Sequence, residues 1–270
     1  MMKISIIIPS YKPGEYIKEC LSSLKRQTLS PCDFEIIVVL NGCGDPYLSV
    51  LKNYIEEVNL VNAHIIQTDT PGVSNARNLG IDSAKGEFLL FIDDDDWISE
   101  NYLENLLALA STDTISNSNV LLIEDGSEKT LPYFLSNAYQ RCSSCSALNL
   151  FNARSFLSSA CGKLIPKDVI ENRRFDTTHK LGEDSFFMFC ISDRIQHIAL
   201  ASEDTIYYVR ARQGSASRRK YKYSTRVVVA ARLTKSYLFQ YMKSPFKYNF
   251  LFWASRVAAT IIKLRKKEYV

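Results

Sequence analysis

The 270-residue chain has no apolar run of the roughly 20 residues that a membrane-spanning helix needs. It has neither GxGxxG after its first predicted strand nor a GxxxxGK(S/T) motif, which excludes the usual dinucleotide fingerprint and the P-loop. No signal peptide is evident, because residues 1–10 lead straight into a strand. The seven cysteines are an odd number without framework spacing, so we expect reduced thiols and a cytoplasmic protein. Cys142 and Cys145 form a lone CxxC with no histidine nearby, which favours ordinary thiols over a zinc site.

Acidic residues are almost absent from the last 60 positions. Residues 211–270 hold 15 of the 33 basic residues and one of the 29 acidic ones, a net charge of +14 against −10 for residues 1–210. Such an asymmetry predicts an anionic partner, either a membrane surface or nucleic acid. No known reader motif accompanies the charge, so nucleic acid is not the expected partner.

Two helices are predicted in this basic segment, at 224–242 and 248–266, separated by Ser244-Pro245. Lysines crowd the end of the second helix. Its apolar residues recur at three- and four-residue spacing: Phe250, Trp253, Val257, Ile261 and Leu264. The pattern is that of an amphipathic helix at a membrane surface; the alternative is that this stripe packs on the protein core.

Apolar runs of strand length alternate with helical patterns through the first 110 residues. Strands are predicted at 4–9, 34–40, 63–67 and 88–92, and helices at 15–26, 48–57 and 73–84. This alternation predicts an α/β fold with a doubly wound, mostly parallel sheet. Further along, strands are predicted at 120–124 and 205–210, and a polar loop at 136–146.

The clearest chemical signal is the run Asp93, Asp94, Asp95 and Asp96, directly after the apolar strand 88–92. Adjacent carboxylates repel one another by roughly 1 kcal/mol per close pair in water. Ligands of open α/β sheets bind beyond the carboxyl ends of the strands. Carboxylate oxygens favour Mg²⁺ or Mn²⁺, with a nucleotide diphosphate completing the shell. We therefore predict a metal site; the alternative is an acidic turn that caps the next helix, which needs only one or two aspartates.

Four stretches, in this order, resemble the family 2 inverting glycosyltransferases with a GT-A fold, of the type that builds bacterial surface polysaccharides. They are Ile6-Ile-Ile-Pro-Ser-Tyr11, Gly72-Val-Ser-Asn-Ala-Arg-Asn-Leu-Gly80, the Asp93 to Asp96 run and Gly182-Glu-Asp184. The resemblance implies a GT-A catalytic domain at residues 1–215, with a Rossmann-like, mostly parallel central sheet flanked by helices. Residues 216–270 would then form a basic, amphipathic helical extension.

The resemblance also implies where a nucleotide-sugar donor binds. It places Pro9, Ser10 and Tyr11 along the nucleoside, with the Tyr11 ring stacked on the base. It places Arg77 and Asn78 on a helix that faces the nucleotide. From the residues alone, Tyr11 also fits a core position and Arg77 a solvated helix surface.

The aspartate run would then hold the metal. Asp95 matches the family's metal-binding position, Asp93 would lie near the ribose or the metal, and Asp94 is the variable middle residue. The chain departs from the family after the second strand, where Leu40-Asn41-Gly42-Cys43 replaces the common Asp-Asp-Gly-Ser. Asn41 keeps a hydrogen-bonding group for the nucleotide, but a UDP-sugar is the donor expected from the family alone.

The pair Glu183-Asp184 matches the family's Glu-Asp pair, whose aspartate is the general base. Inversion is a direct displacement at the anomeric carbon, and one carboxylate must take the acceptor proton. Asp184 is the expected base, with Glu183 orienting the acceptor; the alternative is simple helix capping. Arg210, Arg212, Ser215 and Arg218, in or next to the basic loop 212–223, would close over the diphosphate as a flap.

These features predict a metal-dependent glycosyltransferase that moves a sugar from a nucleotide diphosphate to a glycan or lipid-linked acceptor. A basic tail of this kind predicts peripheral binding to the inner face of the membrane. Two alternatives stay open: a non-catalytic membrane-surface module that binds nucleotide sugars, and a nucleotidyltransferase. The second would need a Gly-rich basic loop after the first strand, of which residues 11–14 are a poor version.

Overall fold

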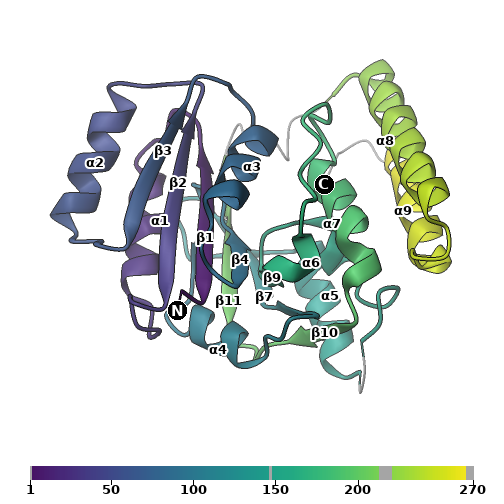
Figure 1. The fold of residues 1–270 in the computed structure, drawn as a ribbon, viewed down its shortest axis with the longest axis horizontal. Helices are drawn as coiled ribbons and strands as arrows, with labels where there is room; N and C mark the ends of the chain where they lie inside the picture. Colours follow the sequence, from purple (N-terminus) through teal and green to yellow (C-terminus); the bar gives the residue numbers. More distant parts are fainter. Residues whose placement is uncertain (1, 146–147, 213–220, 266–270) are drawn as a thin grey trace.

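The computed structural model describes residues 2–145, 148–212 and 221–265. Within them, seven strands form one sheet in the order β10-β6-β9-β4-β1-β2-β3 (Figure 1). The half from β4 to β3 is wholly parallel, which confirms the doubly wound α/β sheet predicted from the alternating pattern. Its elements are β1 (Ile4–Ser10), α1 (Tyr16–Lys25), β2 (Phe34–Asn41), α2 (Tyr47–Glu57), β3 (Ala63–Thr68), α3 (Val73–Ser83) and β4 (Phe88–Phe91).

The other half of this sheet is mixed. β9 (Lys163–Pro166) runs antiparallel to both β4 and β6 (Thr114–Asn117), and β10 (His197–Leu200) pairs parallel with β6. β4 is therefore flanked by β1 on one side and by the late strand β9 on the other. This insertion brings residues 159–166 to the strand that carries the aspartate run.

A second sheet within the described residues has the order β5-β11-β7-β8. Its strands are β5 (Trp97–Ile98), β7 (Asn119–Glu124), β8 (Thr130–Leu131) and β11 (Ile206–Ala211). β5 follows the aspartate run directly and pairs antiparallel with β11. The predicted strands at 120–124 and 205–210 therefore exist, and β11 runs beside the end of β4.

One segment predicted as a loop is a helix. The polar stretch 136–146 falls largely in α5 (Phe134–Ser143). Leu135, Ala138, Tyr139 and Cys142 recur at three- and four-residue spacing and are buried. The prediction was wrong because the polar residues that suggested a loop lie between these buried positions, on the side of the helix that faces away from the core. The remaining helices before the C-terminal pair are α4 (Tyr102–Ala108), η1 (Phe156–Ser158), α6 (Lys167–Ile170), α7 (Glu183–Ile191) and η2 (Ser192–Arg194).

Close packing of α3 on the parallel sheet fixes the position of Arg77. A Cβ added at Gly80 would lie 2.3 Å from Cγ2 of Ile7, so any larger residue would push α3 off β1. Every residue of β1 is buried, which leaves the strand no room to give way. Arg77, about one turn before Gly80, is thus held over the carboxyl end of the sheet.

The C-terminal segment forms two long helices, α8 (Tyr223–Lys243) and α9 (Phe250–Arg265), as predicted. They lie side by side next to α7, at the right-hand edge of Figure 1. α8 buries Arg226, Ala230, Leu233 and Tyr237. The predicted stripe of α9 is divided: Trp253 and Val257 are partly buried and pack against the core, whereas Phe250 is 57% and Ile261 49% exposed. The buried positions of α9 are Phe252, Arg256 and Thr260. The domain boundary at residue 215 stays a prediction.

Candidate active site

The four aspartates after β4 have separate partners. Asp93 accepts a hydrogen bond from Arg77, Asp94 from the hydroxyl of Ser10, and Asp95 from Nε of Arg212. The Asp96 carboxylate is buried and accepts from the Tyr207 hydroxyl at 2.8 Å and from the Arg210 N–H at 2.9 Å. Asp96 therefore fixes β5 and β11, while the first three aspartates surround the open end of β4.

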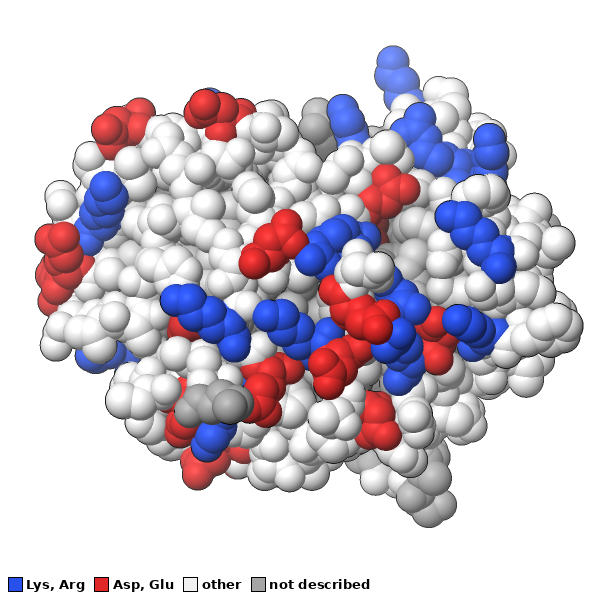
Figure 2. All heavy atoms as spheres, viewed as in Figure 1, with Lys and Arg blue, Asp and Glu red and all other residues white. Residues whose placement is uncertain are grey.

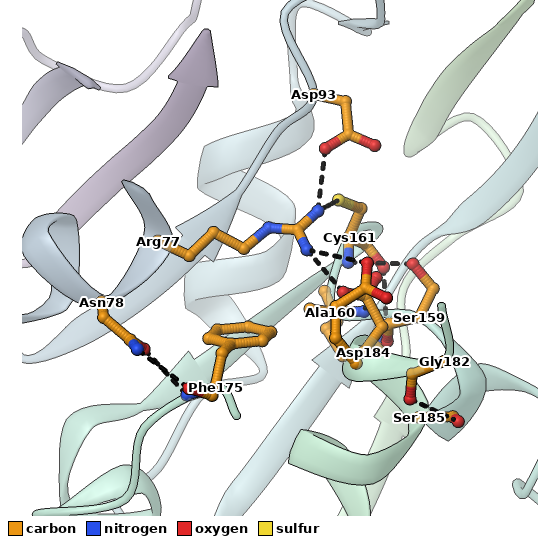
Figure 3. Close-up of polar contacts among 12 residues, drawn as sticks. Arg77, Asn78, Asp93, Ser159, Ala160, Cys161, Phe175, Gly182, Asp184 and Ser185 are labelled. Carbon is orange, nitrogen blue, oxygen red and sulfur yellow. Dashed lines mark hydrogen bonds and ion pairs between the residues drawn. The ribbon is translucent and has the colours of Figure 1, made fainter. Parts of the chain in front are cut away.

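Arg77 is the centre of the site (Figure 3). Its side chain is 3% exposed and lies between Asp93 and Asp184, with nitrogen–oxygen distances of 2.9 Å and 2.5 Å. Glu183 is a third carboxylate, 3.9 Å away. Burial by itself would lower the pKa of Arg77, but Asp184 and Asp93 outweigh it and raise that pKa well above its usual value. The solvated-surface alternative for Arg77 is thereby excluded.

Both oxygens of Asp184 are held. Oδ1 accepts from Arg77, and Oδ2 accepts from the Ala160 N–H at 3.1 Å. Gly182, the N-cap of α7, has φ +79, a conformation that favours glycine and turns the chain so that Glu183 and Asp184 open the helix. A carboxylate has about four lone-pair positions, so Asp184 keeps acceptor capacity for a substrate hydroxyl.

Burial changes the protonation of the carboxylates around Arg77. Burial and the neighbouring Asp184 raise the pKa of Glu183 to about 7, against the opposing effect of Arg77. Burial also raises the pKa of Asp94 to about 7, although its hydrogen bond from Ser10 acts in the other direction. Perturbed carboxylates gathered at the carboxyl end of a parallel sheet are typical of functional sites.

The predicted nucleoside-binding residues lie beside the aspartates. Pro9 and Ser10 end β1 and are buried, and Tyr11 is 52% exposed, which excludes the core position for its ring. The buried Asn41 donates to the Ser10 carbonyl at 2.7 Å and accepts from the Gly72 N–H at 2.9 Å. Asn41 thus connects the end of β1 to the loop after β3. Contact of Pro9, Ser10, Tyr11 and Asn41 with a nucleotide stays a prediction.

Asn78 has its amide engaged by the protein. It donates to the Phe175 carbonyl at 2.9 Å and accepts from the Phe175 N–H at 2.8 Å (Figure 3). In this arrangement it fixes the loop that leads to Gly182 rather than pointing a free amide at a donor. Of the predicted flap, Arg210 and Arg212 bind the aspartate run and its neighbours, whereas Ser215 and Arg218 lie outside the described residues.

The predicted metal ligands form an incomplete set by themselves. Across residues 2–145, 148–212 and 221–265, no group of three or more His, Cys, Asp or Glu side chains is placed to hold a metal ion. The side chains of Asp93 and Asp95 are 44% and 14% exposed, and each is paired with an arginine. Two carboxylates fit a Mg²⁺ or Mn²⁺ ion that takes its other ligands from substrate phosphates and water. Cys142 and Cys145 are free thiols.

Several residues of the site gave no sequence signal. Ala160, Cys161 and Tyr207 are ordinary residues by type, and they reach Asp184, Arg77 and Asp96 through the topology of β9 and β11. No pattern in the sequence points to the convergence of these segments, because it depends on long-range strand order.

The C-terminal helix α8 supports α7, the helix that carries the candidate base Asp184. Leu233 of α8 packs on Gly182: a Cβ added at Gly182 would lie 2.6 Å from its Cδ1. The hydroxyl of Tyr237 is 2.9 Å from that of Ser185 on α7. Within the described residues, no helix is long and apolar enough to cross a membrane.

Comparison with known proteins agrees with this arrangement. The family model described as glycosyl transferase family 2 matches residues 5–141, about half of the chain, and the chain therefore belongs to this family. It is 28% identical over 220 residues to the poly(ribitol-phosphate) beta-N-acetylglucosaminyltransferase TarS of Staphylococcus aureus (strain MW2), a match that covers 79% of this chain and 36% of TarS. The chain thus spans about a third of the length of the first curated relatives it matches.

Two solved structures share the fold. A crystal structure of S. aureus TarS 1-349 in complex with UDP has a TM-score of 0.69 at 20% identity, covering 96% of this chain and 71% of that one. The mannosyltransferase PcManGT of Pyrobaculum calidifontis, in complex with GDP-Man and Mn²⁺, has a TM-score of 0.63 at 15% identity, covering 97% and 75%. The GT-A fold expected from the four motifs is confirmed.

Proposed function

We propose that this chain is a metal-dependent, inverting glycosyltransferase that moves a sugar from a nucleotide diphosphate to an acceptor in surface polysaccharide or teichoic acid synthesis. One observation carries the proposal: Arg77 joins Asp93, at the expected donor end, to Asp184, the expected base. The family supports sugar transfer, the TarS structure with UDP supports a UDP-sugar donor, and the name of TarS supports a polyol-phosphate acceptor. A nucleotidyltransferase has no such support.

The roles of the residues follow from their positions. An acceptor hydroxyl beside Asp184 gives its proton to the carboxylate while its oxygen bonds to the anomeric carbon. The bond from that carbon to the diphosphate breaks on the opposite side, so the configuration inverts. Arg77 keeps Asp184 oriented, and Glu183, whose pKa is raised to about 7, is placed to orient the acceptor.

Asp93 and Asp95 would hold the divalent cation, which when bound neutralises the leaving diphosphate as a Lewis acid. Arg212 forms an ion pair with Asp95, and this ion pair would have to break for Asp95 to hold a cation. The Tyr11 ring, half exposed beside Ser10, is available to stack on the base. The structure of a fold relative in complex with GDP-Man and Mn²⁺ supports the metal dependence of the proposed reaction.

We also propose that the outer face of α8 and α9 rests on an anionic membrane surface. Eleven of the eighteen large apolar side chains exposed in the described residues lie between Tyr223 and Ile262, which concentrates them on these two helices. Figure 2 shows basic side chains gathered at the upper right, where α8 lies in Figure 1. Exposed apolar residues beside lysines and arginines are the composition of an interfacial helix.

The test of the enzymatic proposal is transfer from UDP-sugars by wild type and Asp184→Asn, with UDP binding measured by calorimetry with and without Mn²⁺. We expect Asp184→Asn to lower kcat by about 10²–10⁴-fold, the usual contribution of a general base, and to leave UDP binding within a few-fold. Asp82→Asn, on the same α3 helix as Arg77 but 57% exposed, is the matched control. Retained turnover in Asp184→Asn would remove it as the base; UDP binding without turnover by the wild type would favour the non-catalytic module.

A further inference from the structure

A buried lysine lies next to the candidate base and has no part in the reaction above. Lys163 begins β9 and is 1% exposed. A buried ammonium is costly unless hydrogen bonds and nearby charge compensate it. Burial lowers the pKa of Lys163 to about 8, although Cys161 and Asp184 act in the other direction, so the group is mostly charged at neutral pH. An apolar side chain would fill this place without that cost.

The ammonium group holds the segment that contacts Asp184. Nζ of Lys163 donates to the Ser159 carbonyl and to the Cys161 carbonyl, each at 2.7 Å. Between them lies Ala160, whose N–H donates to Oδ2 of Asp184 at 3.1 Å. The Cys161 N–H donates to Oγ of Ser159 at 3.1 Å and closes the segment on itself. Figure 3 shows Ser159, Ala160 and Cys161 next to Asp184.

The same segment is tied to the donor side of the site. Cys161 forms an isolated parallel bridge with Phe91, the last residue of β4 and two positions before Asp93. Its sulfur lies 3.9 Å from a guanidinium nitrogen of Arg77. Residues 159–161 therefore span the distance between the strand that carries the aspartates and the helix that carries Asp184.

We propose that Lys163 is a positioning residue for the transfer reaction, which fixes residues 159–161 so that the Ala160 N–H holds Oδ2 of Asp184. The proposal rests on the proposed function, because it gives Asp184 the role of base. Arg77 holds the other oxygen, and a carboxylate fixed at both ends directs its free lone pairs one way. Misplacement of a catalytic group by about 1 Å can cost about 10²-fold in rate. Lys163 itself touches no reacting atom.

The test compares Lys163→Met with Lys167→Met. Lys167, which follows β9 and begins α6, donates to the Ala84 carbonyl at 2.6 Å. Its N–H donates to the Glu87 carbonyl just before β4, at the opposite end of that strand from the aspartate run, so Lys167→Met controls for the loss of a lysine–carbonyl bond. We expect Lys163→Met to lower kcat by about 10–100-fold with the donor KM within about twofold, and Lys167→Met to leave kcat unchanged. Lys163→Gln, which keeps N–H donors, should restore part of kcat.

Hydrogen exchange at the Ala160 amide gives a readout that does not depend on turnover. It should be faster in Lys163→Met and unchanged in Lys167→Met. An unchanged kcat in folded Lys163→Met, or an equal loss of kcat in Lys163→Met and Lys167→Met, would overturn the proposal. If Lys163→Met does not fold, Lys163→Gln takes its place: its kcat should lie below that of the wild type, and a wild-type kcat would overturn the proposal. If the wild type transfers no sugar, the proposed function fails, whereas unchanged Ala160 exchange in Lys163→Met would show that Lys163 does not hold residues 159–161.

Discussion

Replacing Arg77 with methionine should destabilise the protein strongly and in a pH-dependent way. The guanidinium is 3% exposed and lies 2.5 Å from Asp184, 2.9 Å from Asp93 and 3.9 Å from Glu183. Methionine keeps much of the apolar stem but leaves three carboxylates without their shared cation. Removing one partner of a buried ion pair costs about 3–5 kcal/mol. For a chain of this size that corresponds to a fall in Tm of about 6–20 °C.

The sign of the pH effect follows from linkage. Without the cation, the carboxyl groups around it take up protons more readily in the folded than in the unfolded state. The stability that this protonation contributes is present at low pH and lost as the pH rises through the folded-state pKa values. The difference in free energy of unfolding between wild type and Arg77→Met should therefore be larger at about pH 8 than at about pH 5.

Urea unfolding of both proteins at the two pH values measures this difference. Arg174→Met is the matched control: Arg174 also pairs with an aspartate, Asp82, at 2.6 Å, but the two side chains are 33% and 57% exposed. We expect a loss below about 1 kcal/mol there, with little pH dependence. A loss in Arg77→Met as small as in the control, or equal at both pH values, would refute the reasoning.

Two further predictions follow. Because burial and Asp184 raise the pKa of Glu183 from 4.5 to about 7, this group alone should contribute on the order of 2 kcal/mol to the stability lost between about pH 5 and pH 8. Glu183→Gln should remove this part of the slope in urea unfolding and leave the part that comes from Asp94; an unaltered slope would contradict the assignment. Glutamates should be introduced at Phe239 and Met242 on α8 and at Phe246 in the turn that follows it, positions that are 62%, 64% and 103% exposed. The triple change Phe239→Glu, Met242→Glu and Phe246→Glu should weaken cosedimentation with phosphatidylglycerol vesicles at least about tenfold. Val50→Glu on α2 should not, and vesicle binding unaffected by the triple change would exclude this surface as the membrane contact.

The vesicle test uses substitutions rather than deletion of the tail because of how α8 is packed. Leu233 lies on Gly182, and Tyr237 is hydrogen-bonded to Ser185. Deleting residues 224–270 would expose α7 and disturb the candidate base, so lost vesicle binding could not be attributed to the outer face. The sequence showed two amphipathic helices but not that one face of α8 is part of the core.

The sequence predicts the parallel half of the fold well because β1, β2 and β4 are mostly apolar runs bounded by loop residues. β1 and β2 are buried at every position, and their apolar sequences predict buried strands. β6 has the sequence Thr-Ile-Ser-Asn, is also buried at all four positions, and was missed, because three polar residues carry no hydrophobic signal. The second sheet contains strands of two residues, too short for any periodicity.

In the candidate site too, some residues were predicted from the sequence and others were not. Asp93, Asp95, Arg77 and Asp184 were singled out by motif, and the structure brings Arg77 together with both Asp93 and Asp184. The Ala160 N–H was not predicted, because a backbone donor has no residue type to mark it. Its place depends on β9 entering the sheet beside β4, a pairing across 70 or more residues.

The row Asp93–Arg77–Asp184 connects the two halves of the proposed reaction. Arg77 donates from one nitrogen to the donor-side carboxylate and from the other to the base, so neither contact can change without affecting the guanidinium. Asp93 would hold the cation through the oxygen that now accepts from Arg77, which would leave Arg77 more fully engaged with Asp184. The base would then be most firmly oriented when the donor is in place. A donor-first order of binding is the consequence expected from this geometry.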